Sequence, residues 1–553
     1  MLSPSIFQRV QPNFSDPRRR GRLLAAILVL FVVIAYLPAM TSGFIWDDDL
    51  LLTANPNVRS VDGLARIWLG KASCDYTPLT FTSYWLEEKL WGDASAGYHI
   101  VNILLHAISA VLLWRIFEKL RVPGAWLGAL LFAIHPVNVA SVAWIAERKN
   151  ALACVFFFGA WLSYLRFYEL QRGKFYAFSI LLFLLAALSK GAVVTMPIVL
   201  LGCVLWTNRR ITARDALRIV PFLVIATTMA LLTIRYQATA VNFGILPANI
   251  SFRIARAGAA VWIYLREIVF PIGLSPMSPQ WWPDLSSLTA YLPAILVLAF
   301  GILFFAYRRT WARPLLFISG YYLVLLLPVL GFVWMTLQQE IQCADWWQYF
   351  AAPGIFAGIA AGIITLARLT TQRAQVALHI LLCGVVVALT FQTWRRASVY
   401  YSMETYCGAI LAEDPELWSL QTNLGVALGQ EGKLDEAIAR HREALRANPR
   451  FMEAHNNLAN VLVAKGAFDE GEAEYLYARQ LTPSNADVLG NLADLYFREG
   501  KLQNALATDA EAIRADRYNP ERYLKFGAKL MANKQFEQAA ICFRNARLLA
   551  RGN

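Results

Sequence analysis

The hydrophobic and polar positions divide the chain into two parts with different patterns. Up to residue 395, long apolar runs alternate with short polar loops, and after it apolar residues recur at helical spacing among charged ones. Apolar runs of about 18 residues match the roughly 30 Å hydrocarbon core of a bilayer. The first part therefore predicts eleven membrane spans, at about 23–40, 98–116, 124–144, 150–167, 176–189, 192–207, 217–234, 289–306, 314–334, 347–367 and 375–393.

The basic residues between the runs predict the orientation of the spans. Lys and Arg concentrate in cytoplasmic loops, and eleven crossings place all the basic loops on the side of Arg18–Arg22. Those loops are 117–121, 166–174, 208–218, 307–313 and 367–373. Another apolar segment, 253–271, would break this agreement as a crossing, so we expect it to lie along or dip into the outer face. The N-terminal tail 1–22 is then cytoplasmic, the first outer loop is 41–97, and the membrane domain spans 23–395.

The second part, 396–553, contains a repeat with a period of 34 residues. Asn423-Leu424-Gly425 recurs as Asn457-Leu458-Ala459, and small residues and prolines recur at the same offset. This period is typical of tetratricopeptide repeats, which are helix pairs that stack into an α-solenoid. We expect repeats at about 418–451, 452–485, 486–519 and 520–553. The predicted fold is therefore all-α, and the solenoid is either a binding surface for polypeptide or a structural array.

Composition supports a polytopic membrane protein. The chain is 57% hydrophobic and only 16% charged, against about 25% charged residues in soluble domains. Lys and Arg outnumber Asp and Glu by 51 to 38, but much of this charge lies between apolar runs, where it orients spans. We therefore expect no nucleic-acid partner.

Several charged residues fall on the predicted outer side, where the orientation rule disfavours basic residues. Three consecutive carboxylates, Asp47 to Asp49, follow the first span, and Ala146–Asn150 (AERKN) separates two later spans. Lys190 lies in a very short turn, while Arg253 and Arg256 lie in the outer-face segment. Charges at the membrane boundary are candidates for function, although each alone is equally consistent with a side chain that reaches lipid headgroups.

Carboxylates opposite a cationic pocket suit transfer of a sugar from a lipid phosphate. Cations stabilise the departing phosphate, and a carboxylate with a raised pKa takes the proton of the acceptor hydroxyl. Clustered carboxylates also bind divalent metal, which is the alternative role for the triplet.

Four stretches carry a resemblance to a known family: FIWDDDLLLTANPNVRS, GYHIVNILLHAISAVLLW, LFAIHPVNVASVAWIAERKNAL and LSKGAVVTMPIVLL. Followed by tetratricopeptide repeats, they resemble the transmembrane and tetratricopeptide-repeat O-mannosyltransferases and their bacterial relatives. That family is assigned to the GT-C glycosyltransferases. The resemblance implies a polyprenyl-phosphate sugar donor and Ser/Thr O-glycosylation of protein outside the cytoplasm.

By this resemblance, the acidic motif falls on Asp47 as the base and Asp48 as its support, and Asp49 has no assured place. The family's motifs also fall on His135, Glu147, Arg148, Lys149, Lys190 and Asp345. Together with the charges on the outer side, they lead us to expect a phosphate site of Arg148, Lys149, Lys190, Arg253 and Arg256, and a sugar pocket of His135, Glu147, Asp345, Trp346 and Trp347. Relatives tend to have a basic and a tyrosyl residue after the aspartate, where this chain has two tryptophans. These either alter the sugar pocket or anchor the chain at the membrane interface.

The sequence thus predicts an enzyme of the bacterial inner membrane whose repeats lie in the periplasm or outside the cell and bind the acceptor protein. The lipid-linked donor is the expected co-substrate, and we assign no metal ligands, but a divalent metal at the carboxylates stays the alternative. Two alternatives stay open. The acceptor is a glycolipid or polysaccharide, or the protein is a membrane-anchored repeat scaffold without enzymatic activity.

Overall fold

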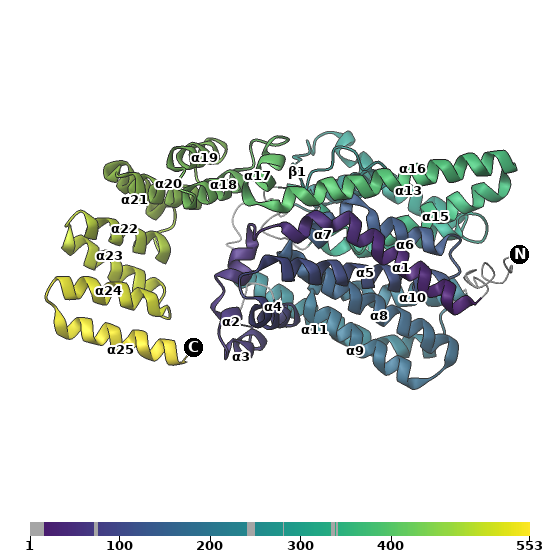
Figure 1. Cartoon of the computed structure of the whole chain (residues 1–553), viewed down its shortest axis with the longest axis horizontal. Coiled ribbons are helices and arrows are strands. Elements are labelled where there is room, and N and C mark those ends of the chain that lie inside the picture. Colours follow the sequence, from purple (N-terminus) through teal and green to yellow (C-terminus); the bar gives the residue numbers. More distant parts are fainter. Residues whose placement is uncertain are drawn as a thin grey trace, which may run out of the picture. The chain divides into compact units, whose positions relative to one another are not determined.

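A computed structural model of the chain describes residues 16–70, 76–208, 210–240, 249–279, 281–332, 338 and 341–552. Most of the predicted tail, residues 1–15, lies outside this range. The chain divides into two compact units, Met1–Ser402 and Met403–Asn553, and each is described by itself. Both are helical, which confirms the all-α prediction (Figure 1).

The first unit contains helices α1 to α16 and one pair of short strands. Its first eight helices are α1 (Pro17–Tyr36), α2 (Pro56–Arg59), α3 (Gly63–Trp68), α4 (Pro78–Trp91), α5 (Ser95–Lys119), α6 (Ala125–Ile134), α7 (Val139–Ala143) and α8 (Arg148–Leu170). The remaining eight are α9 (Gly173–Ser189), α10 (Met196–Asn208), α11 (Ala213–Ala240), α12 (Ile250–Val269), α13 (Leu292–Ala306), α14 (Arg313–Leu326), α15 (Ala352–Leu369) and α16 (Gln372–Ala397).

The apolar helices coincide with the predicted spans. Among the described residues, eight helical segments are long and apolar enough to cross a membrane, and α6 with α7 forms a ninth that is bent by 55°. The other two predicted spans correspond to shorter apolar helices, Gly173–Ser189 and Arg313–Val329. A helix of 17 residues such as α9 is about 25 Å long, slightly short of a bilayer core. The apolar helices indicate a multi-pass membrane protein.

The first loop folds into short helices over a small hydrophobic core. Asn55 accepts a hydrogen bond from the N–H of Asn57 and so caps α2, and Pro78 begins α4 at a position where its missing N–H costs nothing. The core joins the loop to α5 and to the segment before α8 through Leu52, Val58, Ile67, Phe81, Tyr84, Tyr98 and Ile145. The Tyr84 hydroxyl also donates to the Ile145 carbonyl at 2.7 Å. These contacts hold the acidic segment against the start of α8.

A two-stranded antiparallel pair lies beside α12. Strand β1 (Met277–Pro279) pairs with β2 (Ile341–Ala344), and the register is irregular between Ser278 and Pro279. The predicted outer-face segment forms α12, which is not among the candidate spans found in the described part of the chain. Because β2 leads directly into Asp345–Trp347, the strand pair and α12 set the position of these residues.

The second unit is a stack of helix pairs, which agrees with the predicted solenoid. It begins with α17 (Met403–Leu411), and the pairs are α18 (Trp418–Gln430) with α19 (Leu434–Ala447), α20 (Met452–Lys465) with α21 (Phe468–Leu481), α22 (Ala486–Arg498) with α23 (Leu502–Ala515), and α24 (Pro520–Ala532) with α25 (Phe536–Gly552). Gly432, Gly466 and Gly500 end the first helix of three pairs with positive φ, which glycine adopts without strain. Small residues at the helix contacts, such as Ala459 and Ala505, are fully buried.

Candidate functional site

The acidic triplet divides into three environments. Asp48 is 1% exposed, with Oδ2 accepting the N–H of Ile45 at 2.9 Å and Oδ1 accepting the N–H of Ala146 at 2.7 Å. Burial raises the pKa of the Asp48 carboxyl well above its usual range, although the two backbone donors oppose the shift. Asp49 is exposed and accepts the hydroxyl of Thr53 at 2.7 Å, whereas Asp47 is half-buried. Asp47 is therefore the carboxylate that is neither fully buried nor fully in solvent.

Two lysines flank one buried carboxylate beside this triplet. Glu147 is 1% exposed, with Oε1 lying 3.1 Å from the Lys149 ammonium and Oε2 lying 3.7 Å from that of Lys190. The lysine side chains remain 25% and 15% exposed. We call Glu147, Lys149 and Lys190 the lysine pair cluster. Within the cluster two ammonium groups face one carboxylate, so its three side chains together carry net positive charge at a partly solvated position.

Asn150 connects this cluster to two other parts of the first unit. Its carboxamide nitrogen donates to Glu147, to Ser141 at 3.0 Å and to the backbone carbonyl of Trp346 at 3.1 Å. Its carboxamide oxygen accepts from the Lys190 ammonium. Sequence reasoning missed Asn150 as a site residue, although it lies one helical turn after Glu147 and so on the same helix face.

Lys190 reaches the cluster because the end of α9 is fixed. The hydroxyl of Thr80 in α4 donates to the carbonyl of Ser189 at 2.9 Å, and the helix ends at Lys190, whose backbone is extended. The predicted boundary turn thus places this lysine between the first loop and α8.

Arg148 occupies a different environment from its neighbours. It is fully buried, and its guanidinium pairs with Glu87 through both terminal nitrogens. The remaining N–H groups donate to Asn102, to the Tyr98 carbonyl at 2.8 Å and to Ser83 at 3.5 Å. All five donors of the guanidinium are thereby used within the protein. Glu87 was not predicted from the sequence, because nothing in its helical pattern distinguishes it from a solvent-facing residue.

Tryptophans from three segments contact one another beside the acidic triplet. The rings of Trp46 and Trp144 stack with centroids 5.4 Å apart and an angle of 18°, and Trp346 meets Trp144 edge-on at 5.3 Å. Trp346 also contacts Trp347. Trp144, Trp346 and Trp347 are buried, whereas Trp46 is half-buried. The two predicted sugar-pocket tryptophans therefore lie beneath the surface that Trp46 contributes to.

The remaining predicted residues lie at other positions. Asp345 forms an ion pair with Arg396 at the end of α16, a partner that sequence reasoning did not identify. His135 is 3% exposed and stacks against Phe356 at 4.9 Å. No described interaction links this histidine to the lysine pair cluster.

Arg253 and Arg256 hold the segment that precedes β2. Arg256 is 6% exposed and donates to Gln342 at 2.7 Å and to the carbonyls of Gln338 and Ile341. Arg253 is half-buried and donates to the carbonyl of Phe332 at 2.8 Å. The described part of the chain contains no group of three or more His, Cys, Asp or Glu placed to hold a metal ion.

The second unit has a row of asparagines on the first helices of its repeats. Asn423, Asn457 and Asn491 occupy equivalent positions and are all half-buried. The Asn491 carboxamide donates to Asn456 at 3.0 Å, and the Asn456 carboxamide donates to Asn457 at 3.3 Å. The first of these hydrogen bonds joins two adjacent repeats, and the second lies within α20. We call Asn423, Asn456, Asn457 and Asn491 the asparagine row.

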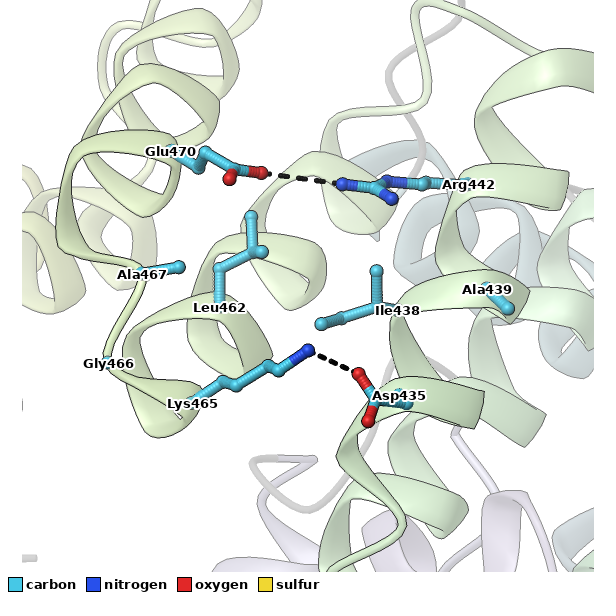
Figure 2. Close-up of a pocket in the computed structure, with 9 residues that line it drawn as sticks. All are labelled: Asp435, Ile438, Ala439, Arg442, Leu462, Lys465, Gly466, Ala467 and Glu470. Carbon is cyan, nitrogen blue, oxygen red and sulfur yellow. Dashed lines mark hydrogen bonds and ion pairs between the residues drawn. The ribbon is translucent and has the colours of Figure 1, made fainter.

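A separate pocket of about 440 Å³ lies between the first two repeats. Figure 2 shows two ion pairs across it, Lys465 with Asp435 and Arg442 with Glu470, with Ile438 and Leu462 between them. The Arg442–Glu470 pair spans 3.4 Å and is largely exposed. Since each charge at the pocket already has a partner of opposite sign, the pocket offers no net charge to a ligand.

Comparison with known proteins agrees with the resemblance drawn from the sequence. Residues 75–235 match the family described as dolichyl-phosphate-mannose-protein mannosyltransferase, and residues 422–486 and 472–520 match the tetratricopeptide repeat. The chain is 26% identical over 473 residues to "Protein O-mannosyl-transferase F38B6.6" of Caenorhabditis elegans, covering 80% of this chain and 65% of that protein. It is 33% identical over 170 residues to "Protein O-mannosyl-transferase TMTC1" of Mus musculus, covering 27% and 18%.

The chain therefore spans less than two thirds of the length of these relatives. Among solved structures, it is similar to "MamA 41-end from Desulfovibrio magneticus RS-1", with 17% identity, 29% of this chain and 89% of that chain covered, and a TM-score of 0.26. A region similar to mannosyltransferases followed by tetratricopeptide repeats confirms the resemblance to the transmembrane and tetratricopeptide-repeat O-mannosyltransferases.

Proposed function

We propose that this protein is a membrane glycosyltransferase of the GT-C type that transfers mannose from a polyprenyl phosphate to Ser or Thr hydroxyls of proteins. The names of its relatives support the sugar and the protein acceptor. The observation that carries the proposal is the hydrogen bond from the Ala146 N–H to Asp48, because it holds the acidic triplet against the segment that carries Glu147 and Lys149.

In the proposed reaction, Asp47 of the acidic triplet lies on one side of the sugar, and Lys149 and Lys190 of the lysine pair cluster lie on the other. Asp47 accepts the proton of the acceptor hydroxyl while the hydroxyl oxygen bonds to the anomeric carbon. The bond from that carbon to the phosphate oxygen breaks, and the phosphate leaves with the electron pair. Lys149 and Lys190 offset the charge that develops on the phosphate, in a partly buried site where such an interaction is stronger than in water.

The arginines take positioning roles in this scheme. Arg148 and Arg256 are buried, and each donates several hydrogen bonds within the first unit, so we assign them to holding the site together rather than to binding phosphate. Arg253 is half-buried and remains a second candidate contact for the donor. Asp48 supports the loop that presents Asp47, as the family resemblance implied.

We further propose that the site faces away from the cytoplasm of a bacterial inner membrane. The basic loops predicted on the other side support this orientation. The repeat unit then lies outside the cytoplasm, where it recruits the acceptor polypeptide along the asparagine row. Carboxamides pair with peptide groups because each offers one donor and one acceptor, as a peptide group does.

The test is sugar transfer by purified protein in vesicles that contain polyprenyl-phosphate mannose, with a Ser/Thr-rich peptide as acceptor. We expect Asp47→Asn to lower the turnover by about 100-fold or more, the range for loss of a general base. The control Asp49→Asn keeps turnover within about threefold, because Asp49 is exposed and bonds only locally. Unchanged turnover in Asp47→Asn would contradict the assignment, and mannose that appears only in lipid products would replace the protein acceptor with a glycolipid.

A further inference from the structure

Helix α4 in the first loop runs along the ends of several apolar helices. Near its beginning, the hydroxyl of Thr80 donates to the carbonyl of Ser189 at 2.9 Å, where α9 ends. Its last residue, Trp91, lies shortly before Ser95, where the candidate span α5 begins. Arg148, at the beginning of α8, bonds to both α4 and α5. Because these contacts place the helix ends at one face of the membrane, the 14 residues of α4 lie along that face over about 21 Å.

Two faces of α4 have different surroundings. Thr80, Tyr84 and Glu87 are spaced by one helical turn and are buried against the rest of the first unit. Leu86 and Leu90 lie on another face, also one turn apart, and are 52% and 68% exposed. A helix at the surface of a soluble protein places polar residues on its outward face. The apolar outward face of α4 therefore indicates a surrounding other than water.

The neighbouring helix α3 extends this apolar face. The indole N–H of Trp68 donates to the Thr82 hydroxyl on α4 at 3.2 Å, and the next residue, Leu69, is 69% exposed. A Cβ added to Gly70 would meet the Tyr236 hydroxyl at 1.8 Å, so α3 ends against the end of α11. The apolar window of that candidate span is only 22% buried inside the protein, so most of it faces lipid.

The exposed apolar residues of the two helices form one surface, which we call the loop apolar surface: Trp68, Leu69, Leu86 and Leu90. Exposed apolar patches mark sites of interaction with proteins or membranes. Helices that lie on a membrane bury apolar side chains at the boundary between headgroups and acyl chains, where tryptophan is also enriched. We propose that the loop apolar surface lies in the headgroup layer of the bilayer, at the membrane face where α5 begins. The partner that covers it is lipid, because the surface is continuous with the ends of lipid-facing helices.

This position relates the lipid to the candidate site. The buried face of α4 supplies Glu87, which pairs with Arg148, and Thr80, whose hydrogen bond fixes the end of α9 before Lys190. The same helix therefore contacts lipid through one face and supports the site through another. The phosphate of a membrane lipid lies in the headgroup layer, so the loop apolar surface holds the site at the depth of lipid phosphates. The proposal goes beyond the proposed function, because it assigns a membrane contact and no step of the reaction.

Photocrosslinking in a bilayer tests the proposal. Leu86 or Leu90 is replaced by a benzophenone amino acid in the full-length protein, which is irradiated in vesicles of phosphatidylethanolamine and phosphatidylglycerol. We expect covalent lipid adducts at both positions by mass spectrometry, because a benzophenone bonds to C–H groups that it touches. Leu298, exposed on the candidate span α13, is the positive control. Leu524, half-exposed on α24 of the repeat unit, is the matched control and should give no lipid adduct.

Two outcomes would overturn the proposal. In the first, lipid adducts form at Leu298 but at neither loop position. In the second, the loop positions give adducts between two protein chains and none with lipid, which would assign the surface to a second copy of the chain. Since the readout is contact with lipid and requires no turnover, the result is separate from that of the Asp47→Asn test.

Discussion

Asp48 and Ala146 are joined by a hydrogen bond of 2.7 Å that crosses 98 positions of sequence. The acceptor lies in the first loop and the donor lies just before α8. This contact brings the acidic triplet beside the lysine pair cluster and keeps Asp48 itself out of solvent. Of the two adjacent aspartates, Asp48 therefore holds the loop in place, whereas Asp47 is the half-buried one.

Asp48→Asn should destabilise the protein rather than remove a catalytic group. The carboxamide keeps one acceptor oxygen, so one of the two backbone donors at Ile45 and Ala146 then faces an NH₂ group. An unsatisfied buried donor costs about 1–3 kcal/mol. We expect a lower temperature of unfolding in detergent, measured as loss of the monodisperse peak after heating. Asp49→Asn is the control and should match the parent protein.

Removal of Glu87 should be among the most damaging single changes in the first unit. Glu87→Ala leaves the Arg148 guanidinium buried without its counter-charge, which costs about 3–5 kcal/mol. Arg148→Lys should not preserve stability, because an ammonium has three donors and lacks the planar fork that pairs with both Glu87 oxygens. The measurement is folded yield and unfolding temperature. A stable Arg148→Lys protein with reduced affinity for polyprenyl phosphate would instead indicate that Arg148 binds the phosphate.

Lys149→Ala and Lys190→Ala should weaken the binding of polyprenyl phosphate whether or not it carries a sugar. Each change removes one cation from the lysine pair cluster, and we expect a loss of roughly tenfold, equivalent to about 1.4 kcal/mol. The loss shrinks at high salt, because salt screens partly exposed charges. Lys174→Ala is a matched control, since Lys174 is exposed at the beginning of the same helix that ends before Lys190. Equal effects at all three lysines would indicate a general surface charge instead of a site.

The repeat unit should become less stable as pH rises. Burial disfavours the charged form of His455, but the Glu474 carboxylate 2.5 Å away and the Pro449 carbonyl outweigh it, so the pKa of His455 is raised. A raised pKa in the folded state gives stability that is complete below the unfolded value of about 6.5 and is lost as pH rises through the folded pKa. Trypsin cleavage within the repeats of the full-length protein should therefore accelerate between pH 6 and pH 8.

His455→Gln tests the origin of this effect. We compare its cleavage rate with that of the parent protein at each pH, so the pH dependence of trypsin cancels. The two rates should differ most below about pH 6.5, the unfolded pKa, and converge once the pH exceeds the raised folded pKa of His455, where the ion pair no longer contributes. A constant ratio would show that the His455–Glu474 pair does not set the pH dependence.

Asn456→Ala combined with Asn491→Ala should weaken the binding of acceptor peptide to full-length protein about 5- to 30-fold, as expected for loss of one or two hydrogen bonds of about 1 kcal/mol each. Arg442→Ala alters the separate pocket in Figure 2 and should leave peptide binding unchanged. If Arg442→Ala weakened peptide binding and the double asparagine variant did not, the acceptor peptide would bind at that pocket and not at the asparagine row. Peptide affinity is measured with donor absent, so this test does not depend on transfer.

The fold class and the division of the chain into apolar helices and repeats could be predicted from the amino-acid sequence alone. Both follow from periodicity, which is a local property: a run of about 18 apolar residues has one low-energy conformation in lipid, and a 34-residue period repeats one helix pair. Local pattern also identified the charged residues at the ends of the spans. The local pattern did not predict that Arg148 is buried and Lys149 partly solvated, because the two adjacent residues carry the same charge.

Only the tertiary structure decided what each of those charges contacts. Arg148 is buried and forms an ion pair with Glu87, 61 positions earlier in the sequence, whereas Lys149 remains partly solvated. The stacking of Trp46 on Trp144 was not predicted from the sequence, because it depends on a left-handed backbone at Trp46 and on a ring from a distant segment. A buried ion pair or an aromatic stack is stable only when two distant segments meet with the right geometry, and no local pattern records that meeting.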